Sequence, residues 1–429
     1  MSYIIPKDWK LVPLGALINP VIRTETVLAK KEYKLVGVRW YLEGVHIHNV
    51  QTGSEIKTTS LSRVEKDDII YNKMWTSKAA FAIANENHHG AYGSTEYPQF
   101  RAKPKVLNVH FLKYVYHLPR FLYDAKTLCR GTTGRIRLNP KDFLKIEIPL
   151  PSLPEQKKIA EILGTWDNAI ELTGKLIQAK TRRKKGLMQQ LLTGKKRFGE
   201  FVKRKGYKKS KVGKIPKEWG LRHLEKCAEV LFSNVDKKAD KKEKQVLLCN
   251  YTDVYYNDYI TQNLDFMQAT AKVKEIEKYS LKKGDVIITK DSETPDDIAV
   301  PAFVSEKLKN VLCGYHLALI RPDRKVLLGE YLSKLFQLQI YRYYFFTLAN
   351  GVTRFGLTTQ ATLQSLIPLP SIAEQKKIAA ILTACDKEID LLSQKLEALK
   401  QQKKGLMQKL LTGEIRVNHL VRVKQLKKK

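Results

Sequence analysis

Cysteine is scarce and scattered in this sequence. Five cysteines occur among 429 residues, and no two of them form a C-x-x-C pair. An odd, widely spaced set argues against a disulfide framework and a structural zinc site, and it favours a reducing compartment. We therefore expect a cytoplasmic protein. The five residues are Cys129, Cys227, Cys249, Cys313 and Cys385.

Long apolar runs are also missing. No stretch of about 18 consecutive apolar residues occurs, so the sequence predicts no transmembrane helix. The opening segment, MSYIIPKDWK, has no basic stretch followed by an apolar one. No secretory signal is therefore predicted.

Signatures of catalysis are lacking as well. The sequence has no G-x-x-x-x-G-K-[ST] phosphate loop, no glycine-rich S-adenosylmethionine loop and no Asn/Asp-Pro-Pro-aromatic tetrapeptide of the kind amino-methyltransferases carry. The pairs His46/His48 and His88/His89 could bind a metal, but isolated histidine pairs are more often surface residues. We expect no catalytic residue, no metal site and no cofactor bound by this chain.

Acidic residues are far outnumbered by basic ones. Lys and Arg total 77 against 43 Asp and Glu, a formal net charge of +34. A polyanion is the natural partner of such a chain, and we favour nucleic acid over a merely soluble basic surface or a membrane. Hydrophobic residues make up 43% of the sequence, enough for folded cores, and the length fits two or three domains.

The sequence does contain an internal repeat. PLPSLPEQKKIA at 149–160 recurs as PLPSIAEQKKIA at 368–379, and LMQQLLTG at 187–194 recurs as LMQKLLTG at 406–413. Both matches have an offset of 219 residues (368 − 149 and 406 − 187), so no net insertion separates them. IPKDW at 5–9 matches IPKEW at 215–219 with an offset of 210. The order along the chain is therefore domain, helix, domain, helix.

The repeated segments have the marks of long helices. Each ends in a glycine, Gly194 or Gly413, where a left-handed residue commonly follows a helix. About 40 residues at about 1.5 Å each would make a rod of roughly 60 Å. Each segment begins with an S-x-x-E capping box, whose members are Ser152 and Glu155, and Ser371 and Glu374.

Between these ends, apolar residues alternate at spacings of four and three, which is typical of a coiled-coil seam. We predict that the two helices pack antiparallel and place the two domains at opposite ends. The alternative is that each stripe lies on its own domain. Gly186 and Gly405, equivalent by offset, could mark a close helix approach or a shared kink. The predicted helix and partner interface comprises Ile159, Leu163, Trp166, Ile170, Ile177, Leu187, Leu191, Ile378, Leu382, Ile389, Leu392, Leu396, Leu399, Leu406 and Leu410.

Residues 1–150 and 214–369 have the pattern of short apolar runs, turns and helical stretches that is typical of α+β domains. Short apolar runs between turns predict strands, and stretches such as 331–338 predict helices. We therefore expect two globular α+β target recognition domains separated by two long antiparallel coiled-coil helices in a pseudo-two-fold repeat. The predicted segments are domain 1 (1–150), helix 1 (151–194), a basic linker (195–213), domain 2 (214–369), helix 2 (370–413) and a basic tail (414–429). The strands are expected at 33–38, 68–71, 80–84, 285–289 and 317–320.

The basic linker has two interpretations that the sequence leaves open. Residues 175–211 are rich in lysine and arginine, and Glu200 is their one acidic residue. They can form a solvated face and a flexible tether, or they can contact phosphates along a duplex.

Two polar loops in each domain are candidates for binding DNA. A strand-end loop is expected at 71–75 in domain 1 and at 290–294 in domain 2. A glycine turn is expected at 129–137 and at 350–355, where Arg354 aligns with Arg135. Glycine lets a backbone approach a phosphate, and arginine can read guanine in two-point contact. The plain alternatives are an unliganded turn and a core position for Trp75. The candidates are Asn72, Lys73, Trp75, Arg130, Thr132, Thr133, Arg135, Arg137, Lys290, Ser292, Asn350, Thr353 and Arg354.

With these motifs in place, essentially the whole chain resembles the specificity subunit of type I restriction-modification systems. The resemblance rests on the paired PLPSxxEQKKIA starts, the paired LLTG ends and the IPKxW domain openings. It implies that each domain reads one half of a split double-stranded DNA sequence. It also implies two methyltransferase subunits that grip the helices, and ATP-dependent restriction subunits. S-adenosylmethionine, ATP and Mg would belong to those partners, and no membrane is involved.

Two other classes of function stay open on the residues alone. One is an enzyme, a methyltransferase or a nuclease whose motifs are not recognised. The other, the main alternative, is a coiled-coil protein that bridges DNA without sequence preference, whose binding would show only a steep dependence on salt.

Overall fold

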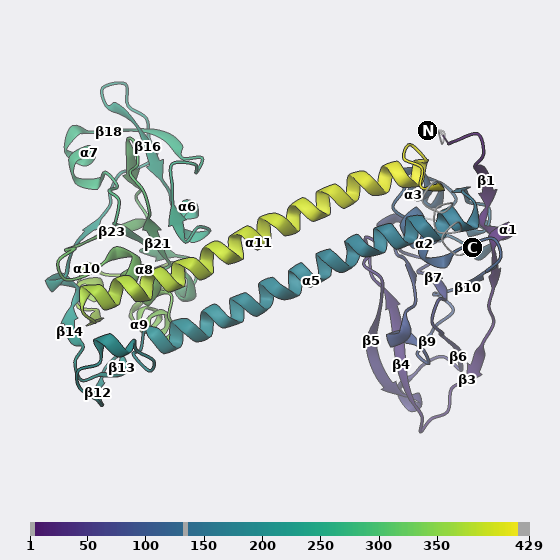
Figure 1. Ribbon diagram of the computed structural model, residues 1–429, viewed down its shortest axis with the longest axis horizontal. Helices are drawn as coiled ribbons and strands as arrows, with labels where there is room; N and C mark the ends of the chain where they lie inside the picture. The colour runs from purple at the N-terminus through teal and green to yellow at the C-terminus, as the bar shows by residue number, and fades with distance from the viewer. Residues whose placement is uncertain (1–4, 132–135, 419–429) are drawn as a thin grey trace, which may run out of the picture. The chain divides into compact units, whose positions relative to one another are not determined.

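The computed structural model describes residues 5–131 and 136–418 (Figure 1). Its contacts divide the chain into unit 1, residues 1–174 with 394–429, and unit 2, residues 175–393. Each unit joins one sheet-rich domain to a segment of each of two long helices. Unit 1 is therefore assembled from both ends of the sequence.

The described residues of the unit 1 domain form three sheets. Strand β1 (Lys10–Pro13) pairs with β11 (Glu147–Leu150) where the chain enters and leaves the domain. A second sheet has the order β2-β10-β7-β8, and a third has the order β3-β6-β9-β4-β5. Their strands are β2 (Ile18–Pro20), β3 (Thr24–Thr26), β4 (Glu32–Val38), β5 (Val45–Thr52), β6 (Ser60–Arg63), β7 (Ile69–Tyr71), β8 (Phe81–Ile83), β9 (Tyr92–Gly93) and β10 (Gln99–Ala102). The α-helices are α1 (Leu14–Leu17), α2 (Val109–Val115), α3 (Pro119–Thr127) and α4 (Pro140–Phe143).

The domain of unit 2 repeats this plan with different strands. Strand β14 (Gly220–His223) pairs with β25 (Leu366–Leu369), as β1 does with β11. A five-stranded sheet has the order β15-β23-β19-β21-β17, and a three-stranded sheet has the order β18-β16-β22. These strands are β15 (Ala228–Phe232), β16 (Lys244–Cys249), β17 (Tyr259–Ile260), β18 (Met267–Ala271), β19 (Val286–Thr289), β21 (Pro301–Val304), β22 (Val311–Cys313) and β23 (Leu317–Pro322). The α-helices are α6 (Tyr251–Tyr255), α7 (Val273–Tyr279), α8 (Gly329–Phe336), α9 (Gln339–Leu348) and α10 (Thr359–Leu363).

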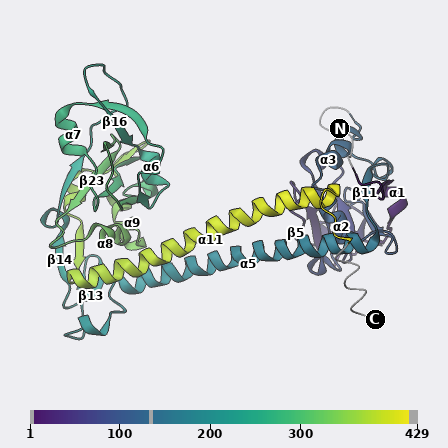
Figure 2. The ribbon, with the colours of Figure 1, turned by 45° about the horizontal axis from the view of Figure 1, so that its top comes forward.

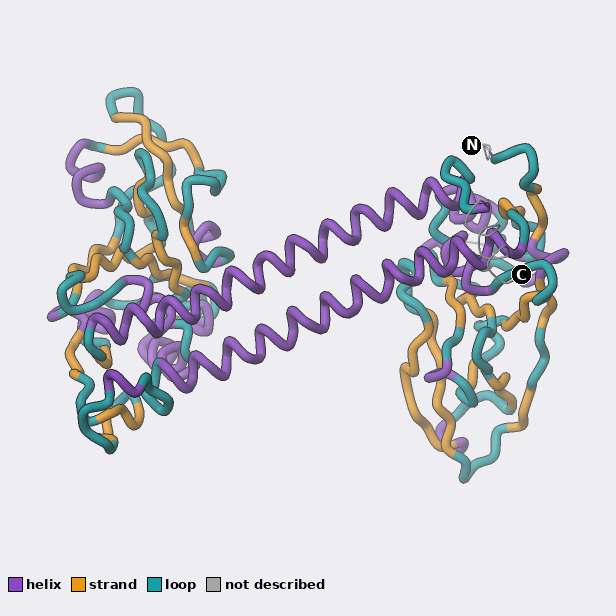
Figure 3. Tube along the Cα trace, viewed as in Figure 1, coloured by secondary structure: helices purple, strands orange, loops and turns teal. Residues whose placement is uncertain are grey.

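The predicted fold class is confirmed, because both domains mix strands and helices (Figure 3). The runs predicted as strands correspond to β4, β7, β8, β19 and β23, and the predicted helical stretch at 331–338 corresponds to α8. Local alternation and turn residues were therefore sufficient to place these elements.

The two repeated segments form the long helices α5 (Leu153–Leu191) and α11 (Ile372–Thr412). Both predicted C-terminal glycines have left-handed backbones, with φ of 68° at Gly194 and 74° at Gly413. A Cβ atom on Gly194 would lie 2.3 Å from Pro216, and one on Gly413 would lie 2.4 Å from Pro6. Glycine is thus required there by packing as well as by backbone conformation.

Within each unit the two helix segments run antiparallel, side by side (Figure 2). In unit 2, Lys180 pairs with Glu388 at 2.5 Å and Lys184 pairs with Asp386. In unit 1, Lys403 pairs with Asp167 at 2.5 Å. Residues further along α5 therefore pair with residues earlier in α11, as expected for antiparallel helices.

The apolar stripe of each helix was expected to pack either on the other helix or on its own domain, and each expectation holds for part of the stripe. The stripe residues nearest the domains are buried in the two domain cores. Those in the middle of the helices are half-buried. None of the fifteen predicted interface residues is exposed. The buried members are Ile159, Leu163 and Leu410 in unit 1, and Leu191, Ile378 and Leu382 in unit 2.

Gly186 and Gly405 do not mark a close helix approach, so that expectation is wrong. Both are exposed, and no atom lies within 4 Å of where a Cβ would be. Each therefore lowers local helix stability without a packing benefit.

A Trp–Glu–Arg contact, which we call the clamp, fastens each helix start to its domain. In unit 1, Glu155 is 2% exposed and accepts hydrogen bonds from Trp9 Nε1 at 3.3 Å and from Arg416 Nε at 2.8 Å. Arg416 also makes two bonds to Asp8, at 2.8 and 2.7 Å. The glutamate of the predicted capping box is therefore directed to the indole and the guanidinium, because a buried carboxylate needs charged partners.

Unit 2 repeats the clamp. Glu374 accepts hydrogen bonds from Trp219 Nε1 at 3.2 Å and from Arg197 Nε at 2.8 Å, and Arg197 also contacts Glu218. The Ser371 hydroxyl caps the Glu374 amide at 3.2 Å, so half of this predicted capping box is present. Arg197 and Arg416 are separated by the helix offset of 219 residues (416 − 197).

The next residue of the motif, glutamine, fixes the loop that leads into α2 in unit 1 and into α8 in unit 2. Gln156 accepts from the Asn108 amide at 2.8 Å and donates to Val106 and Pro151. Gln375 accepts from the Leu328 amide at 3.0 Å and donates to the equivalent carbonyls. The repeated Glu-Gln pair is therefore an anchor for the fold.

The basic linker is ordered and does not form a flexible tether. It contains a short 3-10 turn, Gly199–Phe201, and a hairpin of β12 (Tyr207–Ser210) and β13 (Gly213–Pro216). Arg197 is 9% exposed within its clamp, so it is not available to a phosphate. The lysines of the hairpin remain candidates for phosphate contact.

A buried ion pair in unit 2 generates a stability prediction. Lys334 is fully buried, and its ammonium lies 2.5 Å from Asp386, which also accepts from Tyr259 at 2.7 Å. Burial opposes ionisation of Asp386, but Lys334 and Lys184 outweigh it and lower the carboxyl pKa. Asp386→Asn should lower the free energy of unfolding by about 3 kcal/mol or more, because it leaves Lys334 buried without a counter-charge. Urea unfolding of the full chain measures this.

The equivalent change in unit 1, Asp167→Asn, is the matched control. Its partners Lys113 and Lys403 are 50% and 17% exposed, so we expect a smaller loss of about 1–2 kcal/mol. Hydrogen bonds from Lys403, Tyr114 and Lys113 overcome burial and lower the Asp167 pKa to about 2. Because the folded-state pKa is depressed, its contribution should be present above about pH 4 and lost as the pH falls towards 2. Equal losses for both variants would contradict this account.

Candidate nucleic-acid interface

The structure brings the two predicted loops of the first domain together. The Lys73 carbonyl, just after β7, accepts from the Leu138 amide at 3.0 Å. Arg130 and Arg137 close the glycine turn by exchanging two backbone hydrogen bonds of 2.9 Å. We call this meeting of strand-end loop and glycine turn the junction. Thr132, Thr133 and Arg135 lie outside the described residues.

The second domain builds the same junction. The Lys290 carbonyl accepts from the Leu357 amide at 2.8 Å. Asn350 and Gly356 exchange backbone hydrogen bonds of 3.0 and 2.8 Å, and β20 (Asp291–Ser292) pairs with β24 (Phe355–Gly356). The two domains therefore share a backbone frame at this place although their loop sequences differ.

Side chains at the first junction divide into supporting and accessible groups. Asn72 is 7% exposed, and its Oδ1 accepts from the Met74 amide at 2.9 Å, so it holds the loop in shape. Arg130 is 69% exposed and Arg137 43% exposed. Trp75 is 39% exposed, so the alternative of a core position is wrong for it. Two arginines and one indole can thus reach a ligand.

Glu96 partly neutralises the positive charge of this junction. Its Oε1 lies 3.5 Å from Lys73 Nζ and 3.6 Å from Arg137. A carboxylate between two cations orients them, and it leaves Arg137 with donors for a further acceptor. The Arg137 Nε atom is buried and unpartnered in the described structure.

At the second junction the accessible cation is on the glycine turn. Thr353 and Arg354 are exposed, whereas Lys290 is only 15% exposed and pairs with Asp291 at 2.9 Å. His316 Nδ1 also lies 3.0 Å from Asp291. Burial opposes ionisation of Asp291, but Lys290 and His316 overcome it and lower its pKa. Ser292 lies 3.4 Å from the Tyr251 hydroxyl.

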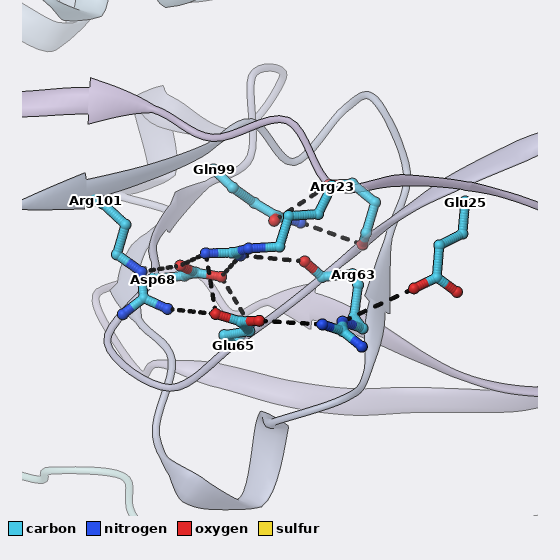
Figure 4. Close-up of polar contacts among 8 residues, drawn as sticks. Arg23, Glu25, Arg63, Glu65, Asp68, Gln99 and Arg101 are labelled. Atoms are coloured by element: carbon cyan, nitrogen blue, oxygen red, sulfur yellow. Dashed lines mark hydrogen bonds and ion pairs between the residues drawn. The ribbon is translucent and has the colours of Figure 1, made fainter.

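Sequence reasoning missed the ion pairs that hold these junctions in place. In the first domain, buried Asp68 precedes β7 and pairs with Arg23 at 2.7 Å and Arg101 at 2.8 Å (Figure 4). In the second, Asp285 precedes β19 and pairs with Arg321 at 2.9 Å. An aspartate directly before each aligned strand was the available signal.

The arginines of the cluster around Asp68 are all held in ion pairs. Its three arginines, Arg23, Arg63 and Arg101, are paired with three carboxylates, those of Glu25, Glu65 and Asp68 (Figure 4). Lys31 also pairs with Glu25, at 3.1 Å. Arginines held by carboxylates in this way position strands and are less free to bind a phosphate. The accessible arginines at the junction are therefore the stronger candidates.

The histidine pairs do not form a metal centre in the part of the chain that the structure describes. No group of three or more His, Cys, Asp or Glu side chains could hold an ion there. His46 and His48 have ring centroids 6.2 Å apart, and burial lowers the His46 pKa. Among the same residues, no helix has the length and apolar character needed to cross a bilayer.

Comparison with known proteins follows the repeat seen in the fold. The model of the family described as the type I restriction modification DNA specificity domain matches residues 6–180 and 216–401. The chain belongs to this family. Each matched segment contains one domain and most of the long helix that follows it, so the two copies of the family domain correspond to the two repeats.

Two relatives from Methanocaldococcus jannaschii match this chain along almost its whole length. The type I restriction enzyme MjaVIII specificity subunit is 26% identical over 428 residues, covering 97% of this chain and 95% of the relative. The putative MjaX specificity subunit is 27% identical over 449 residues, covering 96% and 95%.

Two solved structures share the fold. The type I restriction-modification S subunit from M. genitalium has a TM-score of 0.56 at 15% identity and covers 96% of this chain and 97% of its own. A chain from a structure of type I R-M complex assembly and conformational transition has a TM-score of 0.51 at 16% identity, covering 96% and 100%. At these identities the likeness concerns the fold alone.

The glycine turn generates a prediction for this specificity-domain protein. Gly351 has φ of 142°, and a Cβ there would lie 1.8 Å from the Arg354 carbonyl. Gly351→Ala should destabilise the second junction by more than about 1 kcal/mol, because alanine cannot adopt this backbone without strain. Amide exchange at Asn350 and Gly356 should become faster.

Gly405→Ala is the control of opposite sign. Gly405 lies in an exposed helix with free space around it, so alanine there should raise stability by about 0.5–1 kcal/mol. A Gly351→Ala variant that is as stable as wild type and keeps slow exchange at the turn would refute the steric argument.

Proposed function

We propose that this chain is the DNA specificity subunit of a type I restriction-modification complex, without catalytic machinery of its own. The observation that carries the proposal is the repeated junction. Two domains on one chain share a backbone frame but present different side chains, Arg130 and Arg137 in one and Thr353 and Arg354 in the other. Two such readers suit a target whose two halves differ in sequence.

The electrostatics support a duplex as the ligand. The net charge is +34, whereas the arginines of the clamps and of the Asp68 cluster are held in ion pairs. Exposed cations at the junctions, such as Arg130 and Arg354, and on the β12–β13 hairpin are among those that can meet a polyanion. Arginine can bind a phosphate or the two acceptors of guanine through the same fork of donors.

The partners follow from the family. Two methyltransferase subunits would bind the α5 and α11 helices, whose repeated end motifs, EQKKIA and LMQxL, offer each subunit a similar surface. ATP-dependent restriction subunits would complete the complex. S-adenosylmethionine, ATP and Mg would be carried by these partners in the cytoplasm, and this chain would supply the choice of sequence.

Methylation mapping tests the proposal. The chain is co-expressed with a type I methyltransferase subunit from the same source, and methylated adenines are located across the host genome. We expect one split motif with a fixed spacer that disappears when this chain is deleted. Methylation without a motif, or unchanged without this chain, would instead favour the non-specific DNA-bridging protein.

Arginine variants separate the two readers. Arg137→Ala should weaken binding to the mapped target about 10- to 100-fold and relax specificity only in the half that domain 1 reads. Arg354→Ala should do the same only in the other half. Binding to target duplexes mutated in one half at a time, measured at two salt concentrations, separates base contacts from phosphate contacts.

Exposed lysines outside the junctions provide the matched controls. Lys34→Ala in the first domain and Lys307→Ala in the second remove the same charge. They should change affinity little and leave both half-sites unaltered. If these variants lose as much affinity as the arginine variants, bulk charge and not the junction determines binding.

A further inference from the structure

Three exposed aromatic side chains gather beside the first junction. Trp40, Tyr41 and Trp75 are 43%, 64% and 39% exposed. The Trp40 ring centroid lies 5.0 Å from that of Trp75 and 6.5 Å from that of Tyr41. We call this group the aromatic ledge. Contiguous exposed aromatic surface on a folded domain marks a place of contact.

The turn that carries the ledge is strained. Tyr41 and Leu42 have φ of 57° and 62°, and Ala79, across from them, has φ of 53°. Residues with a Cβ rarely adopt such φ angles, and two in succession mark a strained backbone. The turn is held by hydrogen bonds from the Tyr41 amide to the Lys78 carbonyl at 2.7 Å and from Leu42 to Ala79 at 3.0 Å. The domain thus keeps the indole and phenol rings in a fixed, outward arrangement.

The ledge is continuous with the junction. Trp75 follows Lys73 by two residues on the same loop, and Met74 Sδ lies 4.0 Å from Arg137 Nη2. Arg39 and Lys78, both exposed, flank the ledge along the chain. Aromatic rings among cations suit a ligand that combines flat apolar faces with negative charge, which describes a nucleic acid whose bases are accessible.

The second domain places different aromatic residues at its own junction. Tyr315 is 48% exposed, and Lys290 Nζ lies 4.9 Å above its ring. Tyr251, which contacts Ser292, stacks on Tyr255 with ring centroids 5.5 Å apart. Tyrosines therefore occupy the setting that tryptophans occupy in the first domain.

We propose that the Trp40–Trp75 ledge contacts nucleobases directly, by stacking against a base step that is opened when the first domain binds its half-site. This rests on the proposed function. An intact duplex buries its base faces, so the ledge can contact them only at an unstacked step, and side chains that insert in this way kink DNA in other proteins. The pre-formed turn would offset part of the cost of unstacking, because the rings are already ordered.

The test uses 2-aminopurine, whose fluorescence rises when it is unstacked. The complex with the methyltransferase subunit, without S-adenosylmethionine, binds a duplex of the mapped target. The probe replaces single bases in the half read by domain 1, at positions other than the methylated adenine. We expect fluorescence to rise at one step with the wild-type complex. With the Trp40→Ala/Trp75→Ala double variant that rise should fall at least fivefold and affinity by roughly tenfold or more.

Two further variants keep the inference falsifiable. Trp40→Phe/Trp75→Phe retains stacking faces and should keep most of the fluorescence rise, which excludes a folding defect as the cause. Leu28→Ala removes an apolar side chain that is 60% exposed outside the ledge, and it should change nothing. The salt dependence of binding should be the same for all variants, because no phosphate contact is removed.

The outcomes distinguish this inference from the proposed function. If no split motif is found, the proposed function fails. If the motif is found but the alanine double variant keeps its fluorescence rise and affinity, the ledge inference alone is overturned. Weaker assembly with the methyltransferase subunit, with DNA contact unchanged, would also overturn it and would identify the ledge as a protein-binding surface.

Discussion

The buried glutamate at the start of each long helix is the contact on which the rest of the structure depends. Glu155 and Glu374 are almost fully buried, so each needs positive partners close by. Arg416 and Arg197 supply them from segments that follow the opposite helix, and Trp9 or Trp219 completes the contact. One carboxylate thereby fixes the start of one helix, the end of the other and the opening of a domain. The clamp of unit 1 is consequently incomplete in the first 174 residues, since it includes Arg416.

This constraint accounts for the repeated sequence at the helix starts, whereas the domains diverge. A residue that takes part in the clamp, or in the glutamine contacts beside it, has several fixed partners in each copy, and a substitution would break all of them. In the domains, the common requirement is a buried aspartate before the junction strand, Asp68 or Asp285, paired with an arginine. The loops beyond it contribute backbone hydrogen bonds, which many sequences can make. Their side chains are therefore free to differ between two readers.

The sequence predicted what depends on local pattern. Strand alternation, the helix-ending glycines and the fixed offset between repeats act over a few residues or by direct comparison, and the structure confirms them. The clamp was missed because Glu155 and Arg416 lie 261 residues apart, and Arg197 was assigned to a basic linker on composition alone. Asn72 was expected to contact DNA, yet its amide oxygen caps its own loop. The sequence predicted only part of the aromatic ledge. Trp75 was identified as a candidate, but Trp40 comes from another turn that only the tertiary structure brings next to it.

Buried ion pairs fix the backbone, and the loops above them carry the side chains that can contact DNA. This division affects how precisely such a domain can recognise DNA. When an exposed loop binds a ligand, ordering its side chains costs conformational entropy and lowers the affinity. This entropy cost is largest for long side chains such as arginine. Here Glu96 holds Arg137 and Lys73 before any ligand arrives, and strained turn geometry holds Trp40 next to Trp75. Both arrangements are paid for by the folding of the domain, and both are fixed to the strand that Asp68 secures. A change of sequence preference therefore requires new side chains on the loops, while the pairs that order the backbone beneath them can stay the same.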